Sequence, residues 1–280
     1  MRLLQPTTVD EAVGLLTDEP DAKCLAGGQT LAAMMNADLI EPGALISLKK
    51  IAELQDIERL DSGALRIGAM TTHASLVAYG EFTSAQEIVR KAAQVIAHPA
   101  IRNAGTIGGS IAHGDPAADY PAALVVADAV VNAAGPDGRR VIPIAEFFVD
   151  YLETSLAEGE IVTSIDLPPG PADAVTVYDK IARVDGDFAT LTLALVGTRD
   201  GDGFSSLRIA LGSAGPRPVR VSDVEQSLIG RPITKASLRT VGEALVAACD
   251  PIDDIRGSSA YRLKLVPRVL ARAVNTALAL

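Results

Sequence analysis

The stretch Arg-Asn-Ala-Gly-Thr-Ile-Gly-Gly-Ser at residues 102–110 places a pair of glycines between hydroxyl side chains. An earlier stretch, Ala-Gly-Gly-Gln-Thr-Leu at residues 26–31, has the same character. Because glycine has no Cβ, each pair lets the backbone turn tightly and present its N–H groups to a ligand. Two such loops facing each other suit a diphosphate, and they predict binding of a dinucleotide such as FAD.

The charge of the chain restricts how a phosphate could be held. The formal net charge is -10, so the overall field of the protein repels an anionic cofactor. Local dipoles of backbone N–H groups at loops and helix starts must therefore bind the phosphates. The same charge, without a basic cluster, argues against nucleic acid or an anionic membrane as a partner.

The length of 280 residues predicts about two domains. Because 48% of the residues are hydrophobic but only 4% are aromatic, we expect a core packed mainly with Ala, Val and Leu. The chain has two cysteines, Cys24 and Cys249, which form no CxxC motif. We therefore expect no iron–sulfur cluster in this chain. So few cysteines also fit a protein of the reducing cytoplasm. The most apolar stretch, 122–134, contains Asp128 and is too short to span a bilayer. The three histidines lack metal-ligand spacing, and no catalytic signature is present, so we expect neither a metal site nor catalytic side chains.

Hydrophobic patterning divides the chain into two parts. A strand at 23–26, a helix that Thr30 can cap and a strand at 45–48 predict a βαβ unit with parallel strands. Further strands are expected at 65–69 and 161–167, with a hairpin turn at 135–138. The proline-rich segment 168–171 is the best boundary, and it predicts domains 1–175 and 176–280.

The second domain is expected to hold a three-stranded antiparallel sheet, with strands at 175–181, 189–198 and 204–212. Helices are predicted at 222–228, at 235–247 and from 258 to the end. Pro267 should kink the last helix or mark its first turn. The fold class is therefore α+β.

Five motifs in order resemble those of the FAD-binding medium subunits of molybdenum hydroxylases, the family of carbon monoxide dehydrogenase and xanthine dehydrogenase. Besides the two glycine stretches with their continuation to residue 122, these are the segments 180–189, 212–218 and 254–262. The resemblance covers residues 1 to about 275 and implies a two-lobed PCMH-type FAD-binding domain followed by a C-terminal domain of sheet and helices.

The resemblance also implies which residues bind FAD. The two glycine loops would bracket its diphosphate, and residues from other segments would line the rest of the site. The implied set is Leu25, Ala26, Gly27, Gly28, Gln29, Thr30, Leu31, Ile96, Thr106, Ile107, Gly108, Gly109, Ser110, Asp119, Ile161, Lys180 and Phe188.

Structural roles compete with these assignments. Asp119 would bind sugar or ribityl hydroxyls of FAD, and its alternative role is to cap a helix. Lys180 would belong to the flavin site, and its alternative role is a surface salt bridge. Phe188 lies beside the isoalloxazine, or in the core of the sheet, and Ile96 and Ile161 are walls of the site or ordinary core. For His113, after the second loop, packing or loop structure is favoured over a direct cofactor contact.

By resemblance, the chain is an FAD-carrying electron-transfer subunit. Its flavin would receive electrons from [2Fe-2S] clusters of a small partner subunit, which a large molybdopterin subunit reduces, and would pass them to an external acceptor. The expected assembly is a dimer of heterotrimers. One alternative is a stand-alone FAD oxidoreductase of the vanillyl-alcohol-oxidase-like fold. Another is a non-catalytic scaffold that has lost FAD.

Overall fold

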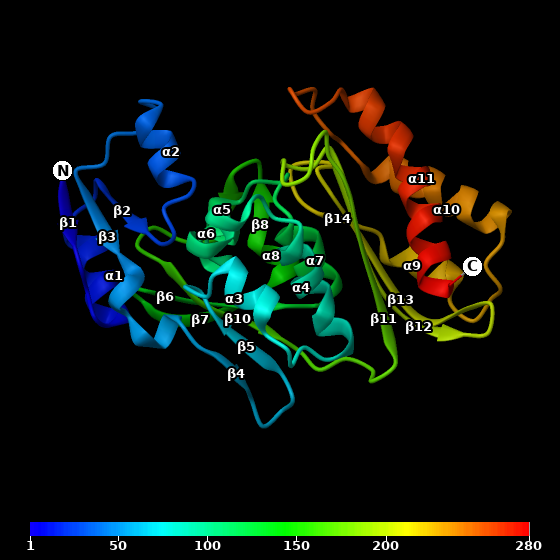
Figure 1. Ribbon diagram of the computed structural model, residues 1–280, viewed down its shortest axis with the longest axis horizontal. Helices are drawn as coiled ribbons and strands as arrows, with labels where there is room; N and C mark the ends of the chain where they lie inside the picture. Colours follow the sequence, from blue (N-terminus) through cyan, green and yellow to red (C-terminus); the bar gives the residue numbers. More distant parts are fainter. Residues whose placement is uncertain (280) are drawn as a thin grey trace.

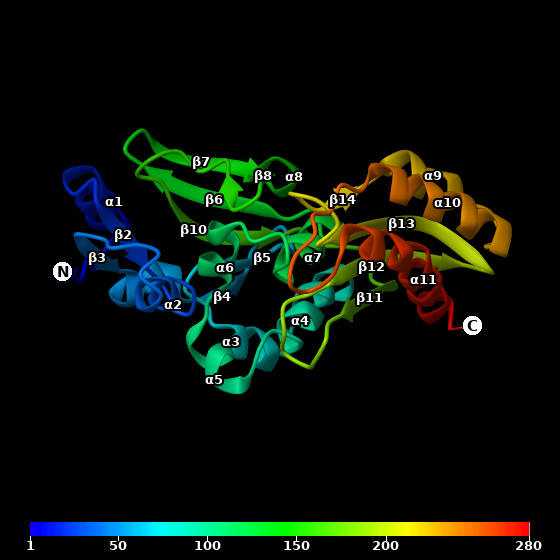
Figure 2. The ribbon, with the colours of Figure 1, turned by 90° about the horizontal axis from the view of Figure 1, so that it is seen from above.

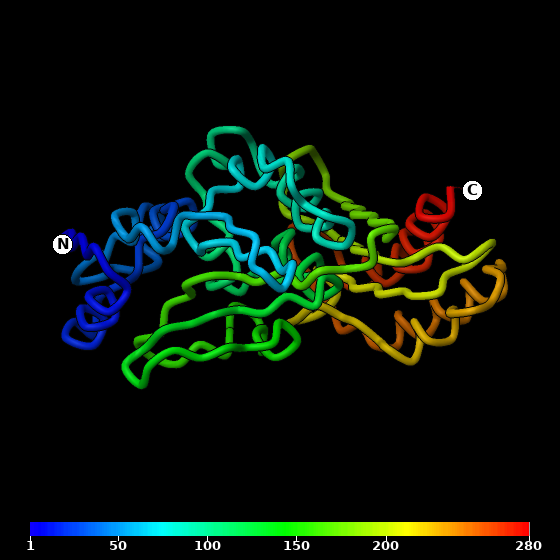
Figure 3. Tube along the Cα trace, turned by 90° about the horizontal axis from the view of Figure 1, so that it is seen from below, coloured from blue at the N-terminus to red at the C-terminus, as the bar shows by residue number. Residues whose placement is uncertain are grey.

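The computed structural model describes residues 1–279 and arranges three main β-sheets one after another along the long axis of the molecule (Figure 1). The N-terminus and the C-terminus lie at opposite ends of that axis, and the views in Figure 2 and Figure 3 agree on this placement. Helices cover the sheets, and three clusters of buried apolar side chains form the core.

The N-terminal sheet is entirely parallel. It has the order β1-β3-β2, and Cys24 of β2 pairs with Ile46 of β3. Its elements are β1 (Arg2–Leu4), α1 (Val9–Asp18), β2 (Ala22–Leu25), α2 (Leu31–Asn36) and β3 (Ala44–Ser47). The predicted βαβ unit is confirmed. The first glycine loop occupies the connection between β2 and α2.

The central sheet is antiparallel, with the order β4-β5-β10-β6-β7. Its strands are β4 (Ile57–Arg59), β5 (Leu65–Gly68), β6 (Val130–Gly135), β7 (Gly138–Pro143) and β10 (Ile161–Leu167), and β8 (Phe148–Asp150) pairs separately with β9 (Glu153–Thr154). The accompanying helices are α3 (His73–Ala78), α4 (Glu87–Gln94), α5 (Pro99–Ala104), α6 (Ile107–His113), α7 (Tyr120–Val126) and α8 (Ile144–Phe147). Short 3-10 helices occupy Leu48–Lys50, Ala52–Leu54 and Ser84–Gln86.

Helix α7 joins the two halves of the molecule. All of its residues are buried, and it packs against α4 on one side and against β12 and β13 of the C-terminal sheet on another. An all-apolar helix of this kind is stable only when it is enclosed by other elements. The segment that follows the second glycine loop is therefore fixed between the central and C-terminal sheets.

The C-terminal sheet has four strands, so the prediction of three was wrong by one strand. The elements are β11 (Ala174–Ile181), β12 (Leu191–Asp200), β13 (Gly203–Gly212), β14 (Val219–Arg220), α9 (Ser222–Leu228), α10 (Lys235–Ala248) and α11 (Ser259–Leu278). The additional strand, β14, pairs with Ala210 and Leu211 of β13. It is only two residues long and follows two prolines, so it is too short to show a strand period.

One further local prediction was wrong, and one of the two alternatives for Pro267 is excluded. Thr30 stands at the N-cap position of α2, but its backbone is in the α region and its side chain makes no capping bond. A side-chain cap normally requires an extended backbone at that residue. Pro267 lies inside a continuous α11 and not in its first turn. It faces Gly242 of α10, where an added Cβ would lie 3.1 Å from the Cβ of Pro267.

Candidate functional site

The structure brings the two glycine loops together. A Cβ placed on Gly27 would lie 2.1 Å from the carbonyl oxygen of Ala104, and one placed on Gly109 would lie 3.2 Å from the Cβ of Ala26. Gly28 has φ +70°, in the left-handed region that favours glycine. The glycines thus permit both the turn of the first loop and its close approach to the second.

The first loop presents unused hydrogen-bond donors. Across the part of the chain that the structure describes, the backbone N–H groups of Gly27, Gly28, Gln29 and Thr30 donate to no backbone acceptor. The loop is partly exposed, and the Gln29 side chain donates 2.9 Å to the carbonyl oxygen of Gly27, which supports the turn. Consecutive free amides in a turn form a concave site for an anion.

The second loop is fixed by the start of α6. The Thr106 hydroxyl accepts a bond of 3.1 Å from the amide of Gly109, which is the cap expected of this residue type. Gly108 is buried, its amide donates to the carbonyl oxygen of Ala69, and an added Cβ would lie 2.5 Å from the Cβ of Ala69. Gly108 is therefore needed for packing on the central sheet, whereas Gly109 and Ser110 are partly exposed beside the first loop.

A buried acid–lysine pair lies at the other end of the predicted residue set. Asp119 is 6% exposed, and its Oδ2 is 2.8 Å from Nζ of Lys180. The Tyr178 hydroxyl donates 2.8 Å to Oδ1, and Lys180 Nζ also donates 3.1 Å to the carbonyl oxygen of Val95, the residue before Ile96. Burial raises the pKa of Asp119, while the Lys180 charge and the hydrogen bonds from Lys180 and Tyr178 oppose the shift.

These contacts exclude two of the structural alternatives for the pair. Asp119 occupies the N-cap position of α7, yet its side chain makes no capping bond, so it is not a helix-cap residue. Lys180 pairs with Asp119 through side chains that are 9% and 7% exposed, so the pair is not a surface salt bridge. A buried pair of this kind must satisfy both charges locally, because neither is hydrated.

A histidine–tyrosine pair connects the two ends of the site. His73 Nδ1 lies 2.8 Å from the hydroxyl of Tyr120, the first residue of α7, and the His73 amide donates to the carbonyl oxygen of Gly105. Burial lowers the pKa of His73 to about 4, and the Arg102 charge adds to the effect. The imidazole is therefore neutral near pH 7 and tethers the second glycine loop to α7.

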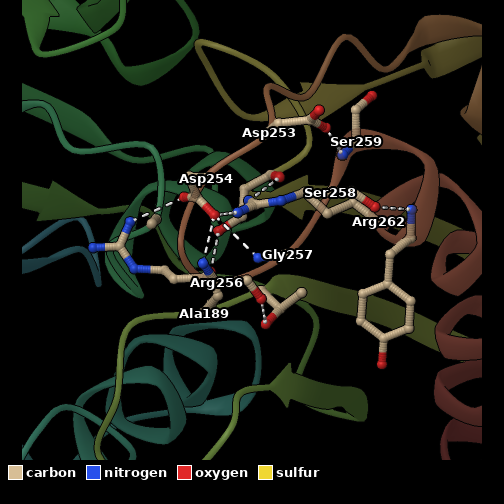
Figure 4. Close-up of polar contacts among 12 residues, drawn as sticks. Ala189, Asp253, Asp254, Arg256, Gly257, Ser258, Ser259 and Arg262 are labelled. Carbon is tan, nitrogen blue, oxygen red and sulfur yellow. Dashed lines mark hydrogen bonds and ion pairs between the residues drawn. The ribbon is translucent and has the colours of Figure 1, made fainter.

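Phe188 is an exposed side chain and not a core residue, so that alternative was wrong. Its side chain is 46% exposed, and Cζ of Arg256 lies 4.8 Å from the centre of its ring. Arg256 is held in turn by Asp254, which accepts bonds from the amide and guanidinium of Arg256 and from Arg262 (Figure 4). The loop after β11 thus rests on the segment that precedes α11.

The remaining predicted residues have less specific positions. Leu25, Ala26 and Leu31 are partly buried in and beside the first loop, and Ile96 packs against the main core while staying partly buried. Ile107 is buried in the core, and Ile161 is only 4% exposed within the N-terminal core cluster. His113 is partly buried in the last turn of α6. Contact of these residues with a cofactor stays a prediction.

Three residues that contact the predicted set or connect its two ends were missed from the sequence: Tyr178, His73 and Tyr120. Tyr178 precedes Lys180 by two positions on β11, so strand alternation places both side chains on one face. That spacing could have identified Tyr178 as a neighbour of Lys180. No sequence signal could have paired His73 with Tyr120, since both are single residues in unrelated segments.

Within residues 1–279, no cluster of three or more His, Cys, Asp or Glu side chains could hold a metal ion. In the same part of the chain, no helix is long and apolar enough to cross a membrane. The adjacent glycine loops with their free amides are typical of a dinucleotide-binding protein, and the mixture of helices and sheets belongs to the α+β class.

Comparison with known proteins specifies the family. Residues 1–170 match the FAD binding domain in molybdopterin dehydrogenase, and residues 176–277 match the CO dehydrogenase flavoprotein C-terminal domain. The chain belongs to the FAD-binding medium subunits of molybdenum hydroxylases, as its motifs indicated. It is therefore a subunit of a molybdenum-containing oxidoreductase that carries an FAD-binding domain.

Individual relatives agree over nearly their full length. The carbon monoxide dehydrogenase medium chain of Hydrogenophaga pseudoflava is 36% identical over 97% of this chain and 95% of its own. The nicotine 6-hydroxylase medium subunit of Paenarthrobacter nicotinovorans is 34% identical over 98% and 96%. The structure of carbon monoxide dehydrogenase from Hydrogenophaga pseudoflava lacking the Mo-pyranopterin moiety superposes with TM-score 0.95 and 37% identity, covering 100% of this chain and 97% of that chain.

Proposed function

We propose that this chain is the FAD-carrying electron-transfer subunit of a molybdopterin-dependent hydroxylase or dehydrogenase. In this role it passes electrons from [2Fe-2S] clusters of a partner subunit to an external acceptor. The observation that carries the proposal is the row of free amides at Gly27–Thr30, facing the second glycine loop in a chain of this family. These donors are neutral, which suits an anionic cofactor in a protein of net charge -10.

The residues present fit FAD at both ends. The amides of the first loop, together with Gly109 and Ser110, would hold the diphosphate. The Asp119–Lys180 pair, Ile96 and the exposed ring of Phe188 would surround the sugar, ribityl and flavin parts. When bound, FAD supplies the redox chemistry, so the chain needs to position it and set its electrostatic surroundings.

The partners in this proposal are a molybdopterin-binding large subunit and an iron–sulfur small subunit, assembled as a cytoplasmic dimer of heterotrimers. Relatives named as medium chains or subunits support such a complex. Burial raises the pKa of the Cys24 thiol to about 12 and that of Cys249 to about 11, so neither forms a cluster-binding thiolate readily. We further propose that the domains are 1–175 and 176–280.

Purification of the chain alone and with co-expressed large and small subunits tests the proposal. The isolated chain should show flavin absorbance and release FAD on denaturation. Its flavin should be reduced by dithionite but not by an organic substrate of the complex, and substrate reduction should appear only when both partners are present. Substrate turnover by the isolated chain would favour the stand-alone oxidoreductase. Absence of bound FAD, even after incubation with excess FAD, would favour the scaffold.

A further inference from the structure

A cleft of about 520 Å³ lies apart from the glycine loops. One side is formed by the C-terminal end of α7, the start of β6, the end of β7 and α8, and the other by residues 217–222 around β14. Asp119 stands at the N-terminal end of α7, whereas the cleft begins at Val125 near its C-terminal end. The cleft is therefore separated from the acid–lysine pair by the length of this helix, about 10 Å for seven residues.

The floor of the cleft is apolar. Val125, Ala129, Ile144 and Phe148 line it, and each is less than a tenth exposed. These side chains belong to the main core, so the floor is supported from beneath. These side chains offer no hydrogen-bond partner, so the floor favours a ligand with an apolar body over one whose polar groups would be left unpaired there.

The rim of the cleft carries an excess of positive charge. Arg220 is fixed by the buried Glu225, which accepts from its Nε at 2.8 Å and its Nη2 at 3.0 Å. Asp128 accepts from Arg220 at 2.7 Å and also pairs with Arg208. Arg217 lines the cleft, is exposed and forms no ion pair within the described residues. The three guanidinium groups of Arg208, Arg217 and Arg220 are balanced by only two carboxylates. One positive charge therefore remains at the cleft, although the net charge of the protein is -10.

We propose that this cleft binds a small organic anion with an apolar body and one carboxylate. The carboxylate would pair with Arg217 at the rim, where a guanidinium offers two parallel donors, and the body would cover the apolar floor. A cleft of this volume is in the range of small-molecule sites. Glu225 and Asp128 hold the Arg220 side chain in place and neutralise it, so the uncompensated charge of the cleft is that of Arg217. The proposal does not depend on the electron-transfer role.

Benzoate and benzamide are matched probes for this site, because they share a ring and differ in charge. The experiment uses the full chain with its flavin, and methyl NMR titrations follow Val125 and Ile144 at the floor. Benzoate should shift these methyl signals, and benzamide should bind at least about tenfold more weakly. Binding of both probes with equal affinity, or no shift of either methyl signal with benzoate, would overturn the proposal.

Two variants at the cleft and one control variant test whether benzoate binds there. Arg217→Glu should weaken benzoate binding by at least about tenfold, whereas Arg239→Glu makes the same charge change at an exposed residue of α10 and should leave it unchanged. Ala145→Phe should also abolish binding, since this exposed alanine lines the cleft and a ring there would fill it. Equal losses in the two glutamate variants would show that only net charge matters and would refute a site at this cleft. Retention of benzoate binding in Ala145→Phe would refute it as well.

Discussion

The two ends of the candidate cofactor site use different chemical groups, backbone amides at one end and charged and polar side chains at the other. At the glycine end, the donors are backbone amides in a partly exposed turn, and no charged side chain is needed to form them. At the acid–lysine end, Asp119, Lys180 and Tyr178 are side chains that satisfy one another inside the protein. The first end can accept an anion without displacing a partner, whereas the second is already neutralised and best suited to neutral polar groups.

This difference implies different consequences of mutation. Substitutions at the glycine end change the path or packing of the backbone, and their cost depends on the free space around each glycine. Removal of one partner at the acid–lysine end leaves an uncompensated buried charge, which is costly even without any ligand.

Lys180→Met should have the largest effect. The carboxylate of Asp119, which is 6% exposed, would lose its cation, and loss of one partner of a buried pair typically costs about 3–5 kcal/mol. Urea denaturation of the flavin-free chain measures the effect directly. The double variant Asp119→Asn/Lys180→Met should recover part of the loss, because no buried charge remains. A loss below about 1 kcal/mol would show that the pair behaves as an exposed one.

The pH dependence of stability tests the tether between the two ends. The pKa of His73 is about 4 in the folded protein and 6.5 without its environment, so the unfolded state takes up a proton first as the pH falls. Stability should therefore be full above pH 6.5 and decrease between pH 6.5 and 4, by up to about 3 kcal/mol. The raised pKa of Asp119 acts in the opposite direction, so the difference between wild type and His73→Asn isolates the histidine. Equal pH slopes for the two proteins would contradict a buried neutral His73.

Alanine substitutions at adjacent glycines separate packing from ligand contact. In Gly108→Ala the new Cβ would meet Ala69 at 2.5 Å, so we expect a loss of stability of about 1–3 kcal/mol from a forced backbone shift. In Gly109→Ala the nearest atoms are at 3.0 and 3.2 Å, so the loss should be smaller, while FAD affinity falls because this residue faces the other loop. Chemical denaturation and FAD titration of both variants provide the measurement. An unchanged FAD affinity in Gly109→Ala would remove this residue from the diphosphate site.

The sequence predicted elements whose signals are local and missed features that depend on tertiary contacts. The βαβ unit followed from apolar runs around a glycine turn, and the hairpin at 135–138 followed from its turn residues. Strand β14 was missed because two residues have no period. The two glycine loops were found, but the packing role of Gly108 depends on Ala69, which lies on another segment.

At the acid–lysine end, too, the sequence identified individual residues but not the tertiary contacts between them. Asp119 and Lys180 were singled out separately, but their pairing depends on how α7 packs against β12, the strand that pairs with β11. Phe188 could not be distinguished from a core residue by its type, because aromatic residues occur in both places. Its exposure arises from a loop that continues past the sheet and rests on Arg256, and no local pattern encodes that contact.

The contact between Phe188 and Arg256 should have the smallest effect, because both partners are accessible to water. A cation over an exposed ring contributes about 0.5–1 kcal/mol, and Arg256 keeps its bonds to Asp254 when the ring is lost. Phe188→Leu and Arg256→Gln, alone and combined, form a double-mutant cycle in which denaturation should give a coupling energy in that range. The same variants should alter FAD affinity only if the ring lies against the flavin. A coupling above about 2 kcal/mol would indicate a desolvated contact and would place this loop with the buried acid–lysine end.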